Sequence, residues 1–315
     1  MTNFLKKLGL FSLLFCYSLS ASSATATWVA GFGEWLQSAS FWDIGFPSAG
    51  DDIVINDPSL QQRLVVTGLN PNINSLTIGT NNLGIDPDEF HIVNARTVTV
   101  SNAGINNDGI ISLNAGANAT SLLLSGSATI SGSGSIVMNN SSNNIIRNSG
   151  GNDTLTLASG ATIRGAGTLI GNFGGMINNG TIIADQATKL VIDTDTEGFA
   201  QAGTLRATGT GGLHILNTPF TNTNGIDIEA GSNLLVEGST IVGGAINIDP
   251  TASATFITSS NLDAVTINGD VTHNNNQTVD IFNGLTLNGT WNMNGGANST
   301  NLLVHGDQSI LGYDR

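Results

Sequence analysis

Two pairs of carboxylates are the side chains of this sequence with the clearest chemical potential. Asp193 and Asp195 form one pair, and Asp227 and Glu229 form the other. Side chains two positions apart project from the same face of a β-strand, so each pair would present its two carboxylates side by side. Carboxylates in this arrangement can hold a divalent cation or act as general acid and base.

Proton abstraction beside such a pair also needs a basic side chain, and this chain has few. It holds nine Lys and Arg against 23 Asp and Glu, and among the basic residues only Lys189 and Arg206 lie near the pairs in sequence. We therefore favour solvated acidic faces over an active site, and keep an enzyme as the alternative.

A calcium-binding motif is incomplete around the first pair. Residues 193–198 read Asp-Thr-Asp-Thr-Glu-Gly, with oxygen ligands and a glycine spaced as in the first half of an EF-hand loop. The loop's last ligand should be a glutamate, but Thr204 occupies its place. Residues 150–155 resemble one copy of a nonapeptide repeat whose Ca²⁺ sites form between consecutive copies. Asp193, Asp195 and Glu197 are thus candidate ligands for Ca²⁺, the one cofactor that the sequence suggests.

Three tryptophans near the start of the chain have two interpretations. Trp28, Trp35 and Trp42 lie at a constant spacing that would suit one helical face, but Gly31 and Gly33 each cost about 1 kcal/mol in a helix interior. We therefore predict short extended pieces and turns over residues 27–57. The rings would plug the open end of a hydrophobic core, and the alternative is an aromatic platform that binds sugar rings.

The histidines, threonines and serines give weaker evidence for a functional site. His91, His214, His273 and His305 lie far apart and outside any ligand spacing such as H-E-x-x-H, so we expect isolated surface or turn histidines. Thr-x-Thr pairs at 97/99 and 154/156 suggest the threonine arrays of ice-binding solenoids, but they do not recur at a constant period. No serine lies in G-x-S-x-G.

The segment 1–26 has the features of a secretory signal peptide. Lys6 and Lys7 precede the apolar stretch 8–20, and small residues lead to a predicted cleavage near Ala26. The apolar run is too short to span about 30 Å of bilayer hydrocarbon, and no later segment is apolar enough to do so. The only cysteine, Cys16, lies in this segment, so the mature chain would have neither a disulfide nor a thiolate site.

The charge balance argues against two kinds of partner. Formal net charge is −14 at pH 7, and loss of the two signal lysines makes the mature chain more acidic still. Nucleic-acid binding rests on clustered Lys and Arg, so we expect neither nucleic acid nor anionic membrane as a partner.

The elements that must position these residues are strands. From Leu64 onward, short alternating runs rich in β-branched residues are punctuated by Gly, Asn and Asp, and no window has helical periodicity. The later strands recur about every 20 residues, which fits one coil of a parallel β-helix. We predict an all-β fold, a right-handed parallel β-helix over residues 58–315, with residues 27–57 as a Trp-rich cap and first strand.

Internal repeats support this architecture. Residues 127–138 match residues 160–171, and residues 114–132 match residues 294–312. We expect Leu124, Ile130, Leu157 and Ile163 to point into the solenoid from parallel strands. Asparagines in the repeated turns, such as Asn178, would stack as amide ladders between coils.

The chain also resembles a group of bacterial exported proteins. The tryptophans followed by Pro-x-x-Gly-Asp-Asp-Ile-Val-Ile at 47–55, and phrases such as GSGSIV, GAGTLIG and MINNGTIIA, are similar to exported β-solenoids. That group includes passenger regions of autotransporter and filamentous-haemagglutinin types and proteins with the PEP-CTERM sorting tail. The resemblance implies a β-solenoid architecture, and carries over no catalytic residue.

The function expected from these features is that of a non-enzymatic surface or matrix protein of adhesin-like type, exported through the Sec pathway. Its partners would be surface glycans or host and matrix proteins. The alternative is a carbohydrate-active β-helix, either a polysaccharide lyase-like enzyme or a polysaccharide-binding module. Because the match at 294–312 stops before its next strand, we also expect a chain truncated at its C-terminal end, or end-to-end self-association.

Overall fold

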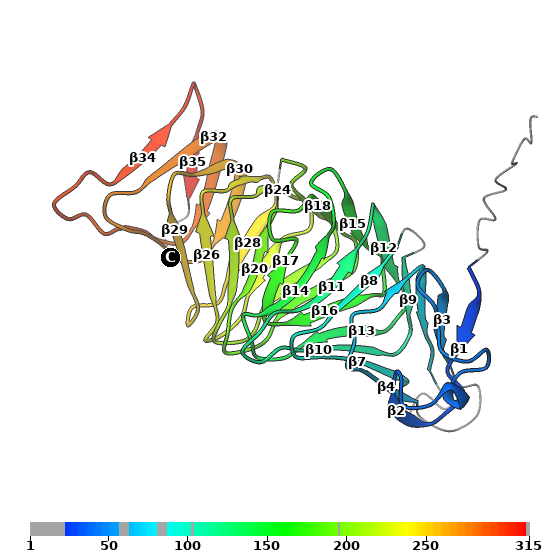
Figure 1. The fold of residues 1–315 in the computed structure, drawn as a ribbon. Helices are drawn as coiled ribbons and strands as arrows, with labels where there is room; N and C mark the ends of the chain where they lie inside the picture. The colour runs from blue at the N-terminus through cyan, green and yellow to red at the C-terminus, as the bar shows by residue number, and fades with distance from the viewer. Residues whose placement is uncertain (1–22, 57–62, 81–86, 102–103, 195, 313–315) are drawn as a thin grey trace, which may run out of the picture.

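The computed structural model describes residues 23–56, 63–80, 87–101, 104–194 and 196–312. Over these residues the chain is almost entirely β, and the one helical element is the 3₁₀ turn η1 (Ala39–Phe41). The strands wind about one long axis in stacked coils, which run from the blue N-terminal end to the red C-terminal end in Figure 1. The predicted signal peptide lies almost wholly outside the described residues.

Each complete coil contributes a strand to each of three faces, and strands on one face stack in parallel. Face I consists of β1 (Thr25–Thr27), β3 (Asp52–Ile55), β6 (Ser75–Ile78), β9 (Ile105–Asn107), β12 (Ala128–Ser131), β15 (Thr154–Leu157), β18 (Gly175–Asn178), β21 (Phe199–Gln201), β24 (Pro219–Asn222), β27 (Thr240–Val242) and β34 (Asn301–Val304). Face II consists of β2 (Phe32–Glu34), β4 (Leu64–Thr67), β7 (Glu89–Val93), β10 (Ile110–Asn114), β13 (Ser135–Met138), β16 (Thr162–Gly165), β19 (Thr181–Ala184), β22 (Thr204–Ala207), β25 (Ile226–Ile228), β28 (Ala245–Ile248) and β35 (Ile310–Gly312). Face III consists of β5 (Asn72–Ile73), β8 (Thr97–Val100), β11 (Thr120–Leu124), β14 (Asn144–Asn148), β17 (Gly167–Leu169), β20 (Leu190–Asp193), β23 (Leu213–Leu216), β26 (Asn233–Glu237), β29 (Ser253–Ile257), β31 (Val271–His273) and β33 (Trp291–Met293).

Two long strands join the first two faces. β30 (Ser260–Asn268) and β32 (Thr278–Asn288) continue around the corner between faces I and II, where the earlier coils have a turn. Faces I and II therefore form one 24-stranded sheet among the described residues, and face III forms a separate 11-stranded sheet. The parallel β-solenoid predicted from the repeats is confirmed.

Coil length varies along the chain. In the earlier part of face II, Ile111 pairs with Ile136 and Ile136 pairs with Ile163. Further along the same face, Ile246 pairs with Ile267, which is a shorter step. The repeat spacing predicted from the sequence is found in the coils that join Ile226, Ile246 and Ile267.

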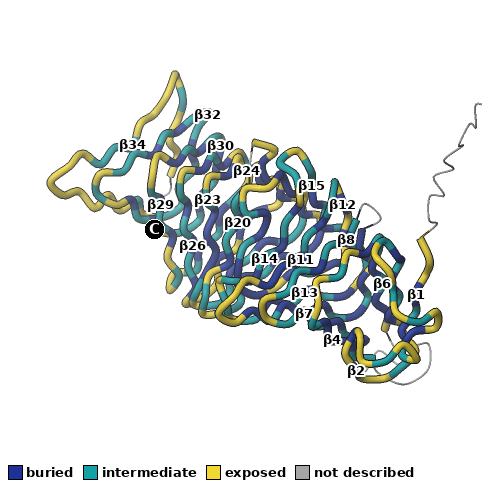
Figure 2. The backbone as a smooth tube through the Cα atoms, viewed as in Figure 1, coloured by how far each residue is buried: buried dark blue, intermediate teal, exposed yellow. Residues whose placement is uncertain are grey.

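The core lies inside the coils and consists of the alternate, inward side chains. Leu124, Ile130, Leu157 and Ile163 are at most 1% exposed and lie in parallel strands, as predicted. Figure 2 shows the buried residues as a dark-blue band along the coils, alternating with half-buried residues. Full burial of one such side chain contributes about 1.5 to 3 kcal/mol.

The repeat that links 127–138 to 160–171 does not equal one coil. It aligns Ile130 with Ile163, but Ile130 stacks on Leu157 within face I, whereas Ile163 stacks on Ile136 within face II. The reason is that all three faces have the same alternation of inward and outward side chains. Two segments on different faces can therefore have sequences as similar as two segments on the same face.

The ladder begins earlier than the predicted boundary at residue 58. β1 pairs with β3 and β2 pairs with β4, so Thr25 is already in a stacked strand. The tryptophans therefore lie within the first coil. Trp28 lies between β1 and β2, and Trp35 and Trp42 lie between β2 and β3.

Buried amides lie at the corner between faces I and II. The side chain of Asn178 donates to the side-chain oxygen of Gln201 at 2.8 Å and to the carbonyl of Thr204 at 3.1 Å, and its own oxygen accepts from the Gly180 N–H. Asn222 repeats the arrangement by donating to the carbonyl of Ala245. Side-chain amides thus stack between coils at this corner, as expected for Asn178.

Candidate functional site

A ladder of polar side chains runs along the outside of face II. Asn288 donates from its amide to the side-chain oxygen of Asn268 at 2.8 Å, and Asn268 donates to Asn247 at 2.7 Å. Asn247 donates in turn to a carboxylate oxygen of Asp227 at 2.7 Å. These residues are register partners in four consecutive coils, so the groups recur at the interstrand distance of about 4.8 Å.

A groove lies beside this ladder. It has a volume of about 570 Å³ and is lined by Asp227, Ile228, Glu229, Ala230, Asn247, Ile248, Asp249 and Asn268. The two isoleucines face the core and are almost fully buried, and the rest of the lining exposes both polar groups and apolar carbon atoms. Hydrogen bonds from the backbone and then the side chain of Thr251 hold the pKa of Asp249 below its usual value.

One basic side chain meets the acidic lining. The Arg206 guanidinium lies 3.3 Å from a carboxylate oxygen of Glu229, and the two side chains are 43% and 47% exposed. Of the two basic residues near the acidic pairs in sequence, Arg206 is thus the one that contacts a pair. Two further carboxylates keep the groove negative, and an exposed ion pair of this kind contributes about 0 to 1 kcal/mol.

The groove is suited to binding hydroxyl groups. An asparagine amide has two N–H donors and an oxygen with two lone pairs, and the bonds of the ladder use one donor of each amide. Carboxylates beside them accept further hydrogen bonds. The surface therefore offers donors and acceptors alternately, in rows, to a ligand that carries repeated hydroxyls.

Two of the three candidate calcium ligands, Asp193 and Glu197, lie within the described residues. Asp193 ends β20, and burial raises the pKa of its carboxyl group. Glu197 is exposed. Residues 150–155, which resemble one copy of a nonapeptide Ca²⁺ repeat, lie two coils before it, because Thr154 pairs with Gly175 and Met176 pairs with Phe199. Asp195 lies outside the described residues. No cluster of three or more metal-ligating side chains is found within the described part of the chain.

The tryptophans are buried at the N-terminal end. Trp28, Trp35 and Trp42 are 0 to 3% exposed, with edge-to-face ring contacts of 4.8 and 5.0 Å, and Trp35 also contacts Phe90. A sugar platform needs exposed ring faces, which these rings do not have, because they pack on one another and on the first coils. Trp35 also borders a groove of about 420 Å³ lined by Leu36, Pro47, Leu69, Pro71 and their neighbours.

A row of titratable groups crosses face III. The Lys189 ammonium donates to Nδ1 of His214 at 3.1 Å, and Nε2 of His214 lies 3.0 Å from a carboxylate oxygen of Glu237. Burial, followed by the charge of Lys189, lowers the pKa of His214, and Glu237 opposes this shift. The imidazole is therefore neutral at pH 7, with its proton on Nε2. Lys189 meets this histidine rather than an acidic pair.

The expectation of surface histidines holds for two of the four. His91 and His305 are partly exposed and contact Glu89 and Asp280, respectively. His214 and His273 are buried, at 5% and 0% exposure, which corrects the expectation for both. The burial of His273 could have been predicted from the alternation Val271-Thr272-His273, because it places His273 on the same inward face as Val271.

The predicted threonine pairs do not form an array. Thr97 and Thr99 stack on Ser121 and Leu123, and Thr154 stacks on Gly175. A short threonine row does exist on face II, where register partners are Thr162, Thr181 and Thr204. It spans only three coils, which gives little area for a flat ice-like surface.

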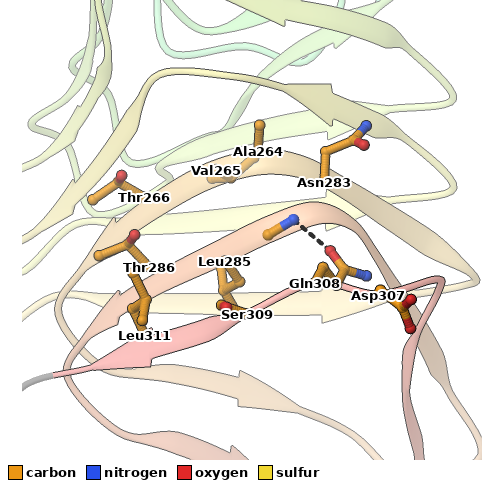
Figure 3. Close-up of a pocket in the computed structure, with 11 residues that line it drawn as sticks. Ala264, Val265, Thr266, Asn283, Leu285, Thr286, Asp307, Gln308, Ser309 and Leu311 are labelled. Atoms are coloured by element: carbon orange, nitrogen blue, oxygen red, sulfur yellow. Dashed lines mark hydrogen bonds between the residues drawn. The ribbon is translucent and has the colours of Figure 1, made fainter.

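A further groove lies at the last coils. It has a volume of about 440 Å³, and its lining residues come from β30, β32, β35 and the segment before β35 (Figure 3). The Gly284 N–H donates to the side-chain oxygen of Gln308 there, so that side chain is engaged within the chain. This groove contains none of the candidate residues that the sequence singled out.

Comparisons of the chain with protein-family models, with curated proteins and with solved structures found no match. The described residues also contain no helix long and apolar enough to cross a membrane.

Proposed function

We propose that this protein is an exported, non-enzymatic β-solenoid of the surface or matrix type, with adhesin-like character. The groove beside the Asp227–Asn288 ladder supports this proposal, because it presents hydrogen-bonding groups in rows along consecutive coils. The proposed export rests on the signal peptide predicted from the sequence. We also propose that the protein belongs to the exported β-solenoids of autotransporter-like or PEP-CTERM type that its sequence resembles.

The proposed partner is a glycan on a cell surface or in a matrix. A chain of sugars carries hydroxyls at regular intervals, and the ladder repeats its donors and acceptors at every coil. The negative lining disfavours glycans with sulfate or uronate groups, since like charges repel. Uncharged polysaccharide is therefore the class that the groove fits best, ahead of host and matrix proteins.

Glycan-array binding of the purified protein tests the proposal. We expect binding to uncharged polysaccharides that falls at least tenfold in Asn247→Ala and in Asn268→Ala. Asn106→Ala is the matched control, because Asn106 is an exposed asparagine on face I, and it should bind like the wild type. Equal binding by all three variants, or no binding to any glycan, would contradict the proposal.

A carbohydrate-active enzyme is the second candidate, and the contact between Arg206 and Glu229 favours it. A lyase would use such a basic group beside carboxylates to abstract a proton from a sugar ring. Incubation with uronate polysaccharides, followed by detection of unsaturated products, tests this candidate. Product that disappears in Arg206→Gln would replace the non-enzymatic proposal, and absence of product from the wild type would eliminate the lyase.

A further inference from the structure

A histidine lies in the hydrophobic interior of the later coils. His273 is 0% exposed at the end of β31, and its register partners on either side are Phe256 and Met293. The ring also meets Trp291 edge-on, with centroids 6.3 Å apart and planes at 80°. Earlier coils have aliphatic residues at this position of face III, such as Ile146.

The imidazole has no hydrogen-bond partner among the described residues. Neither Nδ1 nor Nε2 has a donor or acceptor in hydrogen-bond geometry, although both are shielded from water. Burial lowers the pKa of His273, and the nearby backbone of Gln277 opposes this shift in part without completing such a bond. A neutral ring is costly in such a place, and a charged ring without a counter-ion costs far more.

The surrounding elements supply no counter-ion among the described residues. β29 and β33, which pack on either side of β31, carry no titratable side chain. The carboxylates of the neighbouring strands are engaged elsewhere, because Asp263 accepts from Asn283 and Asp280 contacts His305. Asp270, just before β31, accepts from the Thr290 N–H.

We propose that His273 makes the coils around β31 and β33 acid-sensitive: protonation of its ring opens this segment while the earlier coils stay closed. The opened form would expose the inward side chains of β29, and the imidazolium would reach water. This inference does not depend on the proposed function, since it rests only on the interior of the solenoid.

The direction of the pH effect follows from linkage. A histidine exposed by opening has the ordinary pKa of 6.5, whereas the closed form has a lower pKa and binds the proton less readily. The open form therefore gains stability as pH falls below 6.5. Its population rises by up to about tenfold per pH unit, until the pKa of the closed form is reached. Well above the ordinary pKa this histidine has no effect on opening.

Hydrogen exchange at pH 7.5, 6.5 and 5.5, corrected for the intrinsic exchange rate, tests the inference. The reporter amides are those of Val271 and Asn294, which donate to Thr290 and His273. They should lose protection by up to about fivefold between pH 6.5 and 5.5. The amides of Ser125 and Ser149, which donate between coils of face III that contain no histidine, should not change.

Two variants separate His273 from other acid effects. His273→Met replaces the imidazole with an apolar side chain of similar size that cannot be protonated. It should abolish the pH dependence of the reporter amides. His305→Gln removes an exposed histidine from the same coils and should leave that dependence intact. If His273→Met does not fold, NMR titration of the wild-type imidazole decides. A ring that titrates at its ordinary pKa, or reporters unaffected by pH, would overturn the inference.

Discussion

The side-chain amide of Asn178 connects to Gln201 across two consecutive coils, with a hydrogen bond of 2.8 Å inside the corner of faces I and II. Both side chains are at most 1% exposed. At this corner the inward residue is polar instead of apolar. The turn that follows leaves backbone groups without partners in the strand ladder, and a polar side chain can bond to them. Asn178 satisfies two of them, the N–H of Gly180 and the carbonyl of Thr204.

Asn178→Ala should destabilise the fold markedly. It would leave buried backbone groups and the Gln201 side chain without partners, and each such group costs about 1 to 3 kcal/mol. We expect a loss of about 3 kcal/mol in the free energy of unfolding of the affected coils, measured by denaturant titration. The neighbouring Asn179 is exposed, so Asn179→Ala should change stability by less than about 0.5 kcal/mol. Equal effects of the two variants would contradict this account.

Trp35→Ala should loosen the first coils. The ring is buried against Trp42 and Phe90, and truncation of a buried aromatic side chain costs about 3 to 5 kcal/mol. Amides of β3, β4 and β6 should lose protection from hydrogen exchange, whereas those of β19 and β22 should not. Phe32→Ala is the control, because Phe32 is 67% exposed. Full protection in Trp35→Ala would mean that the tryptophans do not hold the end of the solenoid.

The two neighbours of His214 should shift its pKa in opposite directions. The positive charge of Lys189 lowers this pKa and Glu237 raises it, so Lys189→Gln should raise the value and Glu237→Gln should lower it. Imidazole proton shifts followed by NMR give both values. Identical titrations in the two variants would show that the side chains do not contact the ring in solution.

The N-terminal coils should weaken at low pH through Asp52. Hydrogen bonds from Ser75, and further from Asn74 and Ser23, lower the pKa of this carboxyl group from its usual value of 3.8, against the opposing effect of burial. A carboxylate with a lowered pKa contributes stability above its usual pKa, and this contribution is lost as the pH falls through the folded-state value. Asp52→Asn should show a smaller loss of N-terminal protection between pH 5 and 3 than the wild type. An unchanged profile would assign the loss to other groups.

The strands and their inward residues could be predicted from the sequence alone. Alternation with period two identifies Ile130 and Ile163 as inward residues whichever face they occupy, and the short repeat leaves no room for crossover helices. The parallel order then follows, because each coil exposes an apolar inner edge that only another coil covers. Burial of the tryptophans could be predicted too, since the first coil needs large apolar side chains to close its open end.

The partition into faces and the polar groove could not be predicted in the same way. Asp227, Asn247, Asn268 and Asn288 recur at nearly equal spacing, but their alignment depends on every turn between them. One extra position in a single turn would move a side chain from the outside to the core. The contact of Lys189 with His214 has the same origin, because the intervening turns decide which position of β23 lies beside β20.

The stacking of coils has a mechanical consequence when the chain is held at its two ends. Tension along the axis loads the outermost coil first, because each coil bonds only to its neighbours. A coil such as that from Ile246 to Ile267 replaces one interstrand distance of about 4.8 Å with about 70 Å of extended chain when it peels away. The rod would therefore lengthen in similar increments under load, and an attachment made through it would yield gradually instead of breaking at once.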